Sequence, residues 1–339
     1  MNHVIIFCGA LLLSLLLTPI VKRVMLKSNI LDTPSESRWN RRPVALMGGI
    51  AIFVSFVLVA LFSVNWGREM WVPLLGGGII FLLGVLDDGF GTHPKIKFTI
   101  QLVVALGVAC LGVTIKILPY SWLNILVTVL WIVGLTNALN LLDNIDGLSS
   151  GITVIAALGI LGVSFMKDEV NAGMLSLALA GSCLGFLRYN FNPAQIFMGD
   201  CGSMFLGYML AILSILGGWQ HSSPVLPSFL PPIFILSVAI FDTTLVTVLR
   251  LKHGRLPWQG GRDHLSHRLV ALLGGSEKDA VLILYSIGAV TGGLALLTVR
   301  LESSLFATFV AVVLGVGAIL LGIRVAKVEC YDKEHDLKG

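Results

Sequence analysis

The sequence predicts an all-α polytopic membrane protein, and three features favour that class. Of the 339 residues, 56% are hydrophobic and only 12% are charged, and the mean hydropathy is +0.90. A soluble globular protein carries about 25% charged residues, so a soluble core could not bury this much apolar surface. The apolar residues also gather in runs close to the roughly 20 residues that a helix needs to cross a bilayer. We therefore expect a single integral-membrane domain over residues 1–339.

Eleven apolar segments are the predicted transmembrane helices. The first follows Met1-Asn2-His3, with no basic residue before it and no small-residue cleavage site after it, so we interpret it as a span and not as a signal peptide. An odd number of spans places the two ends of the chain on opposite sides of the membrane. The segments are 3–21, 44–64, 71–86, 98–115, 122–139, 151–166, 172–187, 203–219, 229–249, 279–299 and 304–323.

The basic residues predict the orientation of these spans. With eleven crossings, 19 of the 23 Lys and Arg residues fall on the side that carries the C-terminus. The positive-inside rule assigns that side to the cytoplasm. We therefore expect a multi-pass protein of the plasma (inner) membrane, with its N-terminus outside and its C-terminus in the cytoplasm. The small net charge of +4 does not indicate a nucleic-acid partner.

The first cluster of polar residues follows the third predicted span. Asp87 and Asp88 lie where that span leaves the membrane, and Lys95 and Lys97 come shortly after. Acids at such a depth are costly and usually functional. Paired carboxylates suit a hard cation such as Mg²⁺, and one of them could instead act as a base. The alternative is a solvated helix cap.

The second cluster follows the fifth predicted span and contains no basic residue. Asn137, Asn140 and Asp143 are three residues apart, so on a helix they share one face. Asp146 continues this stripe before Gly147 ends the turn. Two amides and two acids suit a polar ligand, whereas the alternative is a group of capping and turn residues.

The third cluster precedes the eighth predicted span. Asp200 lies between Gly199 and Gly202, which would let the backbone approach a phosphate or a metal ion closely. Phe197 could offer its ring to a nucleotide base, although packing at the membrane interface is the alternative for that residue.

The fourth cluster lies in the longest connection, with Arg262, His264, His267 and Arg268. The two His are three apart on an expected helix, and His with Arg suits a polyanionic ligand. A zinc site is the alternative, but no third Cys or His ligand lies close in sequence. Asp242, within the ninth predicted span, could form a helix–helix bond or take part in catalysis.

Together the four clusters favour metal-assisted chemistry on phosphates, because carboxylates, amides, His and Arg all face one compartment. Two other classes stay open at this point. A transporter would also contain intramembrane acids, but no two-half repeat is visible. A lipid- or nucleotide-sugar-binding sensor would share the residues without turnover.

These motifs resemble those of the polyprenyl-phosphate N-acetylhexosamine-1-phosphate transferase family, and the similarity covers nearly the whole chain. The matching patterns are DDxxxxxPKxKF from Asp87, NAxNxxDxxDGL from Asn137 and NPAxIFMGDxGS from Asn192. A segment around Arg38 matches in part.

The chain departs from the family pattern without losing a carboxylate. The departures are Asn40 in place of His, Ala45 in place of Pro, Asn144 in place of Gly, and Ser266 in place of one His of a pair. The longest connection, which holds His264 and His267, also lacks the three-His segment of the branch that transfers phospho-N-acetylmuramoyl-pentapeptide, and this disfavours that branch. Its activity stays the alternative, together with a non-enzymatic transporter.

The resemblance implies a reaction and its components. N-acetylhexosamine-1-phosphate would pass from a UDP-sugar, with UDP-GlcNAc as the first candidate, to undecaprenyl phosphate, with release of UMP. This step begins the membrane stage of cell-envelope polysaccharide synthesis. The resemblance also implies Mg²⁺ or Mn²⁺ and a membrane-lipid environment, and it allows a homodimer.

The resemblance further implies roles for individual residues. Asp200, with Asp88 beside it, would hold the metal ion. Asp87 would deprotonate the lipid phosphate, and a covalent phospho-aspartyl route is the alternative. The remaining residues would bind the donor: Lys95 and Lys97 at phosphate oxygens, Asn137, Asn140, Asp143, Asp146 and Phe197 around the nucleotide, and Arg262, His264, His267 and Arg268 at the diphosphate or sugar, with the two His close enough to the reaction to be catalytic.

Overall fold

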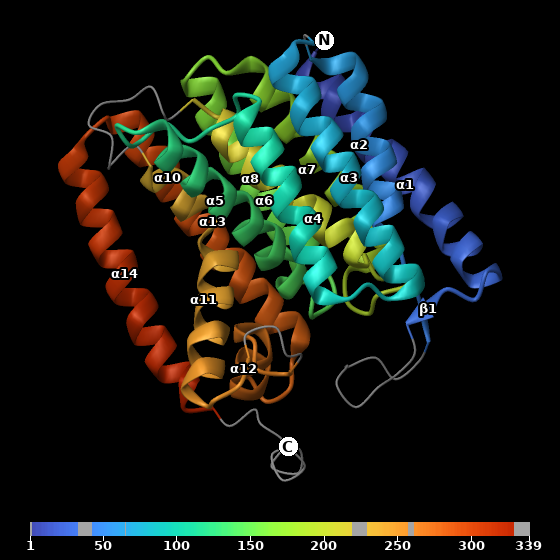
Figure 1. Cartoon of the computed structure of the whole chain (residues 1–339). Helices are drawn as coiled ribbons and strands as arrows, with labels where there is room; N and C mark the ends of the chain where they lie inside the picture. Colours follow the sequence, from blue (N-terminus) through green and yellow to red (C-terminus); the bar gives the residue numbers. More distant parts are fainter. Residues whose placement is uncertain (1, 33–42, 65, 219–228, 257–260, 329–339) are drawn as a thin grey trace.

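The computed structural model describes residues 2–32, 43–64, 66–218, 229–256 and 261–328, and these residues fold mainly into helices (Figure 1). The all-α class is confirmed. In chain order the helices are α1 (His3–Lys27), α2 (Gly49–Ser63), α3 (Arg68–Phe90), α4 (Pro94–Cys110), α5 (Ser121–Leu142), α6 (Leu148–Met166), α7 (Val170–Asn190), α8 (Asp200–Leu216), α10 (Leu230–Ile235), α11 (Ser237–Lys252), α12 (Leu265–Leu272), α13 (Glu277–Leu301) and α14 (Ser304–Ala326).

Each of the eleven predicted spans coincides with helix in the structure. Within the described residues, seven helices are long and apolar enough to cross a membrane: α1, α3, α5, α6, α7, α13 and α14. The apolar helices α2 and α8 are shorter. Three predicted spans differ clearly from the helices. The second does not start at residue 44, because helix begins only at Gly49, and the fourth ends at Cys110 and not at residue 115. The ninth is interrupted at Leu236, between α10 and α11.

A two-stranded sheet precedes α2 and links two of the motif segments. Strand β1 (Leu31–Asp32) pairs antiparallel with β2 (Val44–Ala45), and Ala45 also bridges Ile196. The Phe197 amide donates to the Ala45 carbonyl at 2.8 Å, and the Gly48 amide donates to the Phe197 carbonyl at 2.8 Å. These bonds fix the segment before α8 against the start of α2.

Helix α8 lies at the centre of the bundle. Every residue from Cys201 to Ile215 is buried, and α8 packs against α2, α3 and α5. On one side of this core, α1 packs closely on α7, where a Cβ at Gly181 would lie 2.6 Å from the Phe7 carbonyl oxygen. Small residues allow such close approach between apolar helices. Burial of α8 therefore fixes the position of Asp200, its first residue.

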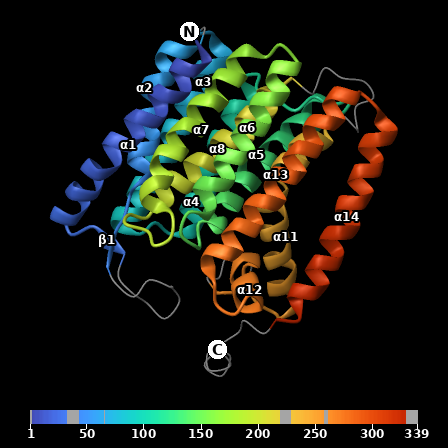
Figure 2. The same ribbon diagram turned by 180° about the vertical axis from the view of Figure 1, so that it is seen from behind.

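The two ends of the bundle differ in character. Helix α1 begins at one end, whereas α12 and β1 lie at the other (Figures 1 and 2). Helix α14 stands at the margin of the bundle in both views, and only 11% of its apolar window is buried inside the protein. The polar connections described below gather at the end that carries α12.

Candidate active site

A pocket of about 420 Å³ opens where the polar connections meet. This volume lies in the range of roughly 300–1,000 Å³ that is typical of small-molecule sites. Segments that are far apart in the sequence contribute to its wall. The lining residues are Asp32, Leu46, Asp88, Asn140, Leu141, Asp143, Asn144, Ile145, Asp146, Asn190, Phe197, Met198, Gly199, Asp200, Gly261, His264, His267 and Glu277.

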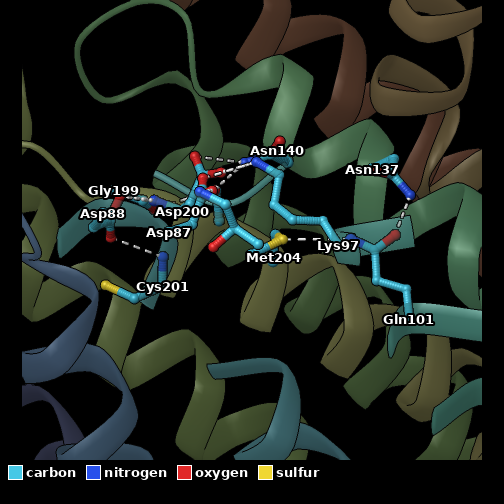
Figure 3. Close-up of polar contacts among 12 residues, drawn as sticks. Asp87, Asp88, Lys97, Gln101, Asn137, Asn140, Gly199, Asp200, Cys201 and Met204 are labelled. Carbon is cyan, nitrogen blue, oxygen red and sulfur yellow. Dashed lines mark hydrogen bonds and ion pairs between the residues drawn. The ribbon is translucent and has the colours of Figure 1, made fainter. Parts of the chain in front are cut away.

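Beside the pocket, one ammonium joins two carboxylates from different helices (Figure 3). The Lys97 Nζ of α4 lies 2.8 Å from Asp87 Oδ2 of α3 and 2.8 Å from Asp200 Oδ2 of α8. The other Asp87 oxygen accepts the Thr92 amide at 2.7 Å. The sequence placed these three residues in two motifs about 100 residues apart, and the helix packing brings them together.

Asp88 caps the N-terminus of α8. Its two oxygens accept the Asp200 and Cys201 amides at 2.8 and 3.0 Å, where the helix dipole favours a negative charge. Gly199 has φ +79°, and a Cβ there would lie 2.5 Å from Asp88 Oδ2. Gly202 packs against Gly49 of α2, so both glycines allow close approach within the protein, and Gly199 also lines the pocket.

Helix α5 sends only part of its predicted stripe to the pocket. Asn140 Nδ2 donates to Asp200 Oδ1 at 3.0 Å and to Ser203 Oγ at 2.9 Å. Asn137 instead donates to Gln101 Oε1 at 2.7 Å, away from Asp200 (Figure 3). Since α5 ends at Leu142, Asp143 reaches the pocket from the C-cap and not from a helical face.

The turn after α5 is held firmly. Asp146 Oδ2 accepts the Ala194 amide at 2.7 Å, and burial raises the pKa of this carboxyl above its usual value, an effect that the bond offsets only in part. The Gly147 amide donates to Asn190 Oδ1 at 3.2 Å, and the Tyr285 hydroxyl donates to the Gly147 carbonyl at 2.6 Å. The turn therefore carries a fixed acidic side chain into the pocket.

The two His come from the segment that opens α12. The helix begins at Leu265, so His264 is its N-cap and only His267 is helical. The ring centroids lie 5.8 Å apart. Burial, followed by the neighbouring His264, lowers the pKa of His267 to about 4. His267 is therefore neutral at neutral pH.

Arg262 and Arg268, which we expected at the diphosphate or sugar, do not line the pocket. Arg268 is buried and does not line the pocket. Its Nε donates to the Asp263 carbonyl at 2.9 Å, and its Nη1 donates to the Val325 and Val328 carbonyls at 3.1 and 2.8 Å. This guanidinium therefore joins α12 to the end of α14. Arg262 also lies outside the lining, although its charge helps to lower the pKa of His267.

The structure adds residues that the sequence reasoning missed. Asp32 of β1 and Glu277, the first residue of α13, both line the pocket, and Asn192 Nδ2 donates to Glu277 Oε2 at 2.9 Å. An acid at the start of an apolar span, as at Glu277, was the available signal. Two departures from the family pattern also meet, because Ser266 Oγ donates to Asn144 Oδ1 at 2.6 Å.

The pocket wall is strongly acidic. Among the described lining residues there are six carboxylates and two imidazoles, but no Lys or Arg. No three His, Cys, Asp or Glu side chains of the described ranges form a ready-made metal site. Mg²⁺ does not need one, because it is usually held by one or two carboxylates together with substrate phosphates and water. The oxygen donors of Asp88 and Asp200 fit such an ion.

Comparison with known proteins decides the family. Residues 70–218 match the model described as glycosyl transferase family 4. A probable undecaprenyl-phosphate N-acetylglucosaminyl 1-phosphate transferase of Bacillus subtilis is 39% identical over 322 residues, which are 91% of this chain and 89% of that protein. The chain belongs to the polyprenyl-phosphate N-acetylhexosamine-1-phosphate transferase family. The transferase is therefore a multi-pass membrane enzyme, and the alternatives of a transporter and a sensor without turnover fall away.

More distant relatives of the transferase fall in two groups. A decaprenyl-phosphate N-acetylglucosaminephosphotransferase of Mycolicibacterium smegmatis is 31% identical over 300 residues, 77% of this chain and 74% of that protein. A phospho-N-acetylmuramoyl-pentapeptide-transferase of Staphylococcus epidermidis is 28% identical over 313 residues, 84% of this chain and 95% of that protein. Both relatives are named as transferases of a phosphosugar.

Two further expectations for the transferase concern Lys95 and the motif segment around Arg38. Lys95 is exposed in the first turn of α4 and does not line the pocket. The motif positions Arg38 and Asn40 lie outside the described residues.

Proposed function

We propose that this transferase moves N-acetylhexosamine-1-phosphate from UDP-GlcNAc to undecaprenyl phosphate and releases UMP. A single membrane domain at the plasma membrane carries this activity, with the pocket on the cytoplasmic side. The observation that carries the proposal is the convergence of Asp88, Asn140, Asp143, Asp146 and Asp200 in one pocket at the end of the bundle. There a soluble cytoplasmic donor can meet an acceptor phosphate whose lipid tail stays in the membrane.

The charge of the pocket supports a bound divalent cation. A diphosphate cannot approach six carboxylates without compensation, and the described wall offers neither Lys nor Arg. Asp200 and Asp88 would hold Mg²⁺ or Mn²⁺, which would offset the charge of the two phosphate groups that must come together. The choice of Mg²⁺ or Mn²⁺ is supported by the oxygen donors of these two carboxylates.

The protein's own residues complete the site. Asp87 lies beside the pocket and not in its lining, bonded to Lys97 and the Thr92 amide, and by its place in the family motif it is our candidate base for the acceptor phosphate. Phe197 and Asp146 line the part of the pocket that we assign to the uridine. His264 and His267 face the diphosphate or the sugar. A homodimer is compatible with this scheme and is not required by it.

Transfer of phospho-N-acetylmuramoyl-pentapeptide is the second candidate activity. The Staphylococcus epidermidis relative carries that name and matches most of the chain. Against it, Ser266 stands where the family pattern has one His of a pair, and it bonds to Asn144. The connection also lacks the three-His segment of that branch, which favours a hexosamine donor without a peptide.

Release of UMP tests the proposed function directly. Purified protein in nanodiscs would be mixed with undecaprenyl phosphate and, in turn, UDP-GlcNAc, UDP-GalNAc or UDP-N-acetylmuramoyl-pentapeptide. We expect UMP with UDP-GlcNAc, only when lipid phosphate and Mg²⁺ are both present, and none with EDTA. Turnover with the peptidyl donor alone would support the second candidate. No UMP from any donor would refute the proposal.

A further inference from the structure

Asp242 of α11 is a fully buried carboxylate with two well-defined partners. Its Oδ2 lies 2.8 Å from His264 Nδ1, and its Oδ1 accepts the Leu265 amide at 2.7 Å. Neither partner belongs to another membrane-spanning helix. The sequence left two roles open for Asp242, a bond between spans and a part in catalysis. These contacts are not a bond between spans. Asp242 acts on the segment that carries the pocket His.

The contact with His264 selects a tautomer. A neutral imidazole has one N–H, and an ionised carboxylate can only accept a hydrogen bond. For a neutral ring facing an ionised Asp242, the proton lies on Nδ1, where it bonds to Asp242 Oδ2. The other ring nitrogen, Nε2, is then an acceptor and is the atom that remains for a ligand. His264 lines the pocket and is 4% exposed, so its ring has little freedom to turn.

Helix α11 also holds the preceding residue, by a separate contact. Arg250 Nε and Nη2 donate to the two oxygens of Asp263 at 2.8 and 2.7 Å. Burial would raise the pKa of Asp263, but its bonds to Arg250 outweigh this and keep it below the usual value. Asp242 and Arg250 are about 12 Å apart along the helix. Arg250 thus anchors the segment at Asp263, while Asp242 orients the imidazole ring of His264.

We propose that Asp242 is a positioning residue that holds His264 in its Nδ1–H form and presents Nε2 to the bound UDP-sugar. The proposal rests on the proposed function for the identity of that ligand. The ligand group that meets Nε2 is a proton-bearing one, a hydroxyl of the sugar, because the diphosphate is ionised and cannot donate. Asp242 itself touches no substrate.

Substitution of Asp242 by Asn reverses the tautomer while keeping the shape. The amide Nδ2 of Asn would donate to His264 Nδ1, so the ring proton would move to Nε2. Loss of a correctly placed acid–base group costs about 10²–10⁴ in rate. We expect Asp242→Asn to lower kcat/KM for UMP release by at least about 100-fold, with protein that is folded and inserted.

A double-mutant cycle separates positioning from general stability. UMP release would be measured for Asp242→Asn, His264→Gln and the double variant. If Asp242 acts through His264, the double variant is no slower than His264→Gln alone. Losses that multiply would show that Asp242 has an independent structural role and would overturn the proposal.

A spectroscopic readout tests the tautomer without any turnover. Solid-state NMR of ¹⁵N-His-labelled protein in lipid would be assigned with His264→Gln. Wild type should show protonated Nδ1 at His264, Asp242→Asn should show protonated Nε2, and the matched variant Asp263→Asn, which loses the Arg250 contact, should keep the wild-type form. Protonated Nε2 in wild type would refute this inference. A correct tautomer in a protein that releases no UMP would refute only the proposed function.

Discussion

At the scale of single residues, Asp200 is a carboxylate that is bonded at both of its oxygens. One of its oxygens accepts Lys97 and the other accepts Asn140, so its position is fixed from two helices. It also follows Gly199 at the first turn of a buried helix. A carboxylate held in this way can bind a cation with little reorganisation, which is what electrostatic stabilisation of a transition state requires.

We predict that Asp200→Asn is folded but loses about 10²–10³ in kcat, because one strong electrostatic contact is removed. Its turnover should also need more Mg²⁺. The measurement is UMP release against Mg²⁺ concentration at equal protein. Asp279→Asn is the matched control, since Asp279 is an exposed acid of α13 outside the pocket. Identical Mg²⁺ curves for wild type and Asp200→Asn would move the metal to other carboxylates.

His267 predicts a dependence of stability on pH. Its pKa is about 4 in the folded protein and 6.5 as a reference. Between these values the unfolded chain binds more protons, so stability falls as the pH falls from about 6.5 to about 4, by on the order of 3 kcal/mol. The raised pKa of Asp146 acts in the opposite direction, because protonation of that carboxyl favours the folded form.

Comparison of variants isolates the His267 contribution. Thermal unfolding in detergent would be followed at several pH values between 4 and 7 for wild type, His267→Asn and His93→Asn. His93 is an exposed N-cap of α4, and Asn preserves that cap. His267→Asn should lose much of the pH slope, and His93→Asn should keep it. Equal slopes in all three proteins would mean that folding does not lower the pKa of His267.

The sequence patterns predicted which segments form the site better than they predicted where each side chain points. Spacing by three correctly placed Asn140 at the pocket, but it also included Asn137, which points to Gln101. Sequence spacing does not say where a helix ends or which neighbour supplies a competing partner. Arg268 shows the same difficulty, because a guanidinium is also a good donor to the free carbonyls at a helix end.

At the scale of elements, hydropathy located the helices but not their interruptions. The predicted ninth span is broken at Leu236, and the Ser237 hydroxyl there donates to Thr291 Oγ1 of α13 at 2.9 Å. Both halves are apolar, so the composition gives no signal of the break. The β1–β2 pair was missed because Val44 and Ala45 look like the start of the following helix.

The attachment of α14 to the rest of the bundle can be tested. This helix contributes little burial, and Arg268 ties its end to α12 through Val325 and Val328. Arg268→Lys cannot reproduce the guanidinium fork. We expect a loss of about 1–3 kcal/mol in stability, faster proteolysis near residue 328, and a donor KM close to wild type in the folded fraction. A large rise in donor KM without destabilisation would restore Arg268 to the substrate site.

At the scale of the whole molecule, polar chemistry and basic residues share one end of the bundle. The end with α12 holds the pocket, and the connections assigned to that side hold 19 of the 23 Lys and Arg residues. Helix α1 begins at the opposite end (Figure 2). An enzyme that joins a soluble donor to a lipid acceptor needs its site at one surface only, and the positive-inside rule indicates which surface that is.

This arrangement predicts the topology of the chain. Reporter fusions after Gly339 and within residues 220–228, both outside the described ranges, should report the cytoplasm and the exterior, respectively. The reason is that α8, the helix before residues 220–228, begins at the pocket with Asp200 and leads away from it to Leu216, whereas α14 ends beside α12. A fusion within residues 33–42 serves as the control and should agree with Gly339. Reporters at Gly339 and at 220–228 on the same side would refute the eleven-span topology, because the chain must cross the membrane an odd number of times between them.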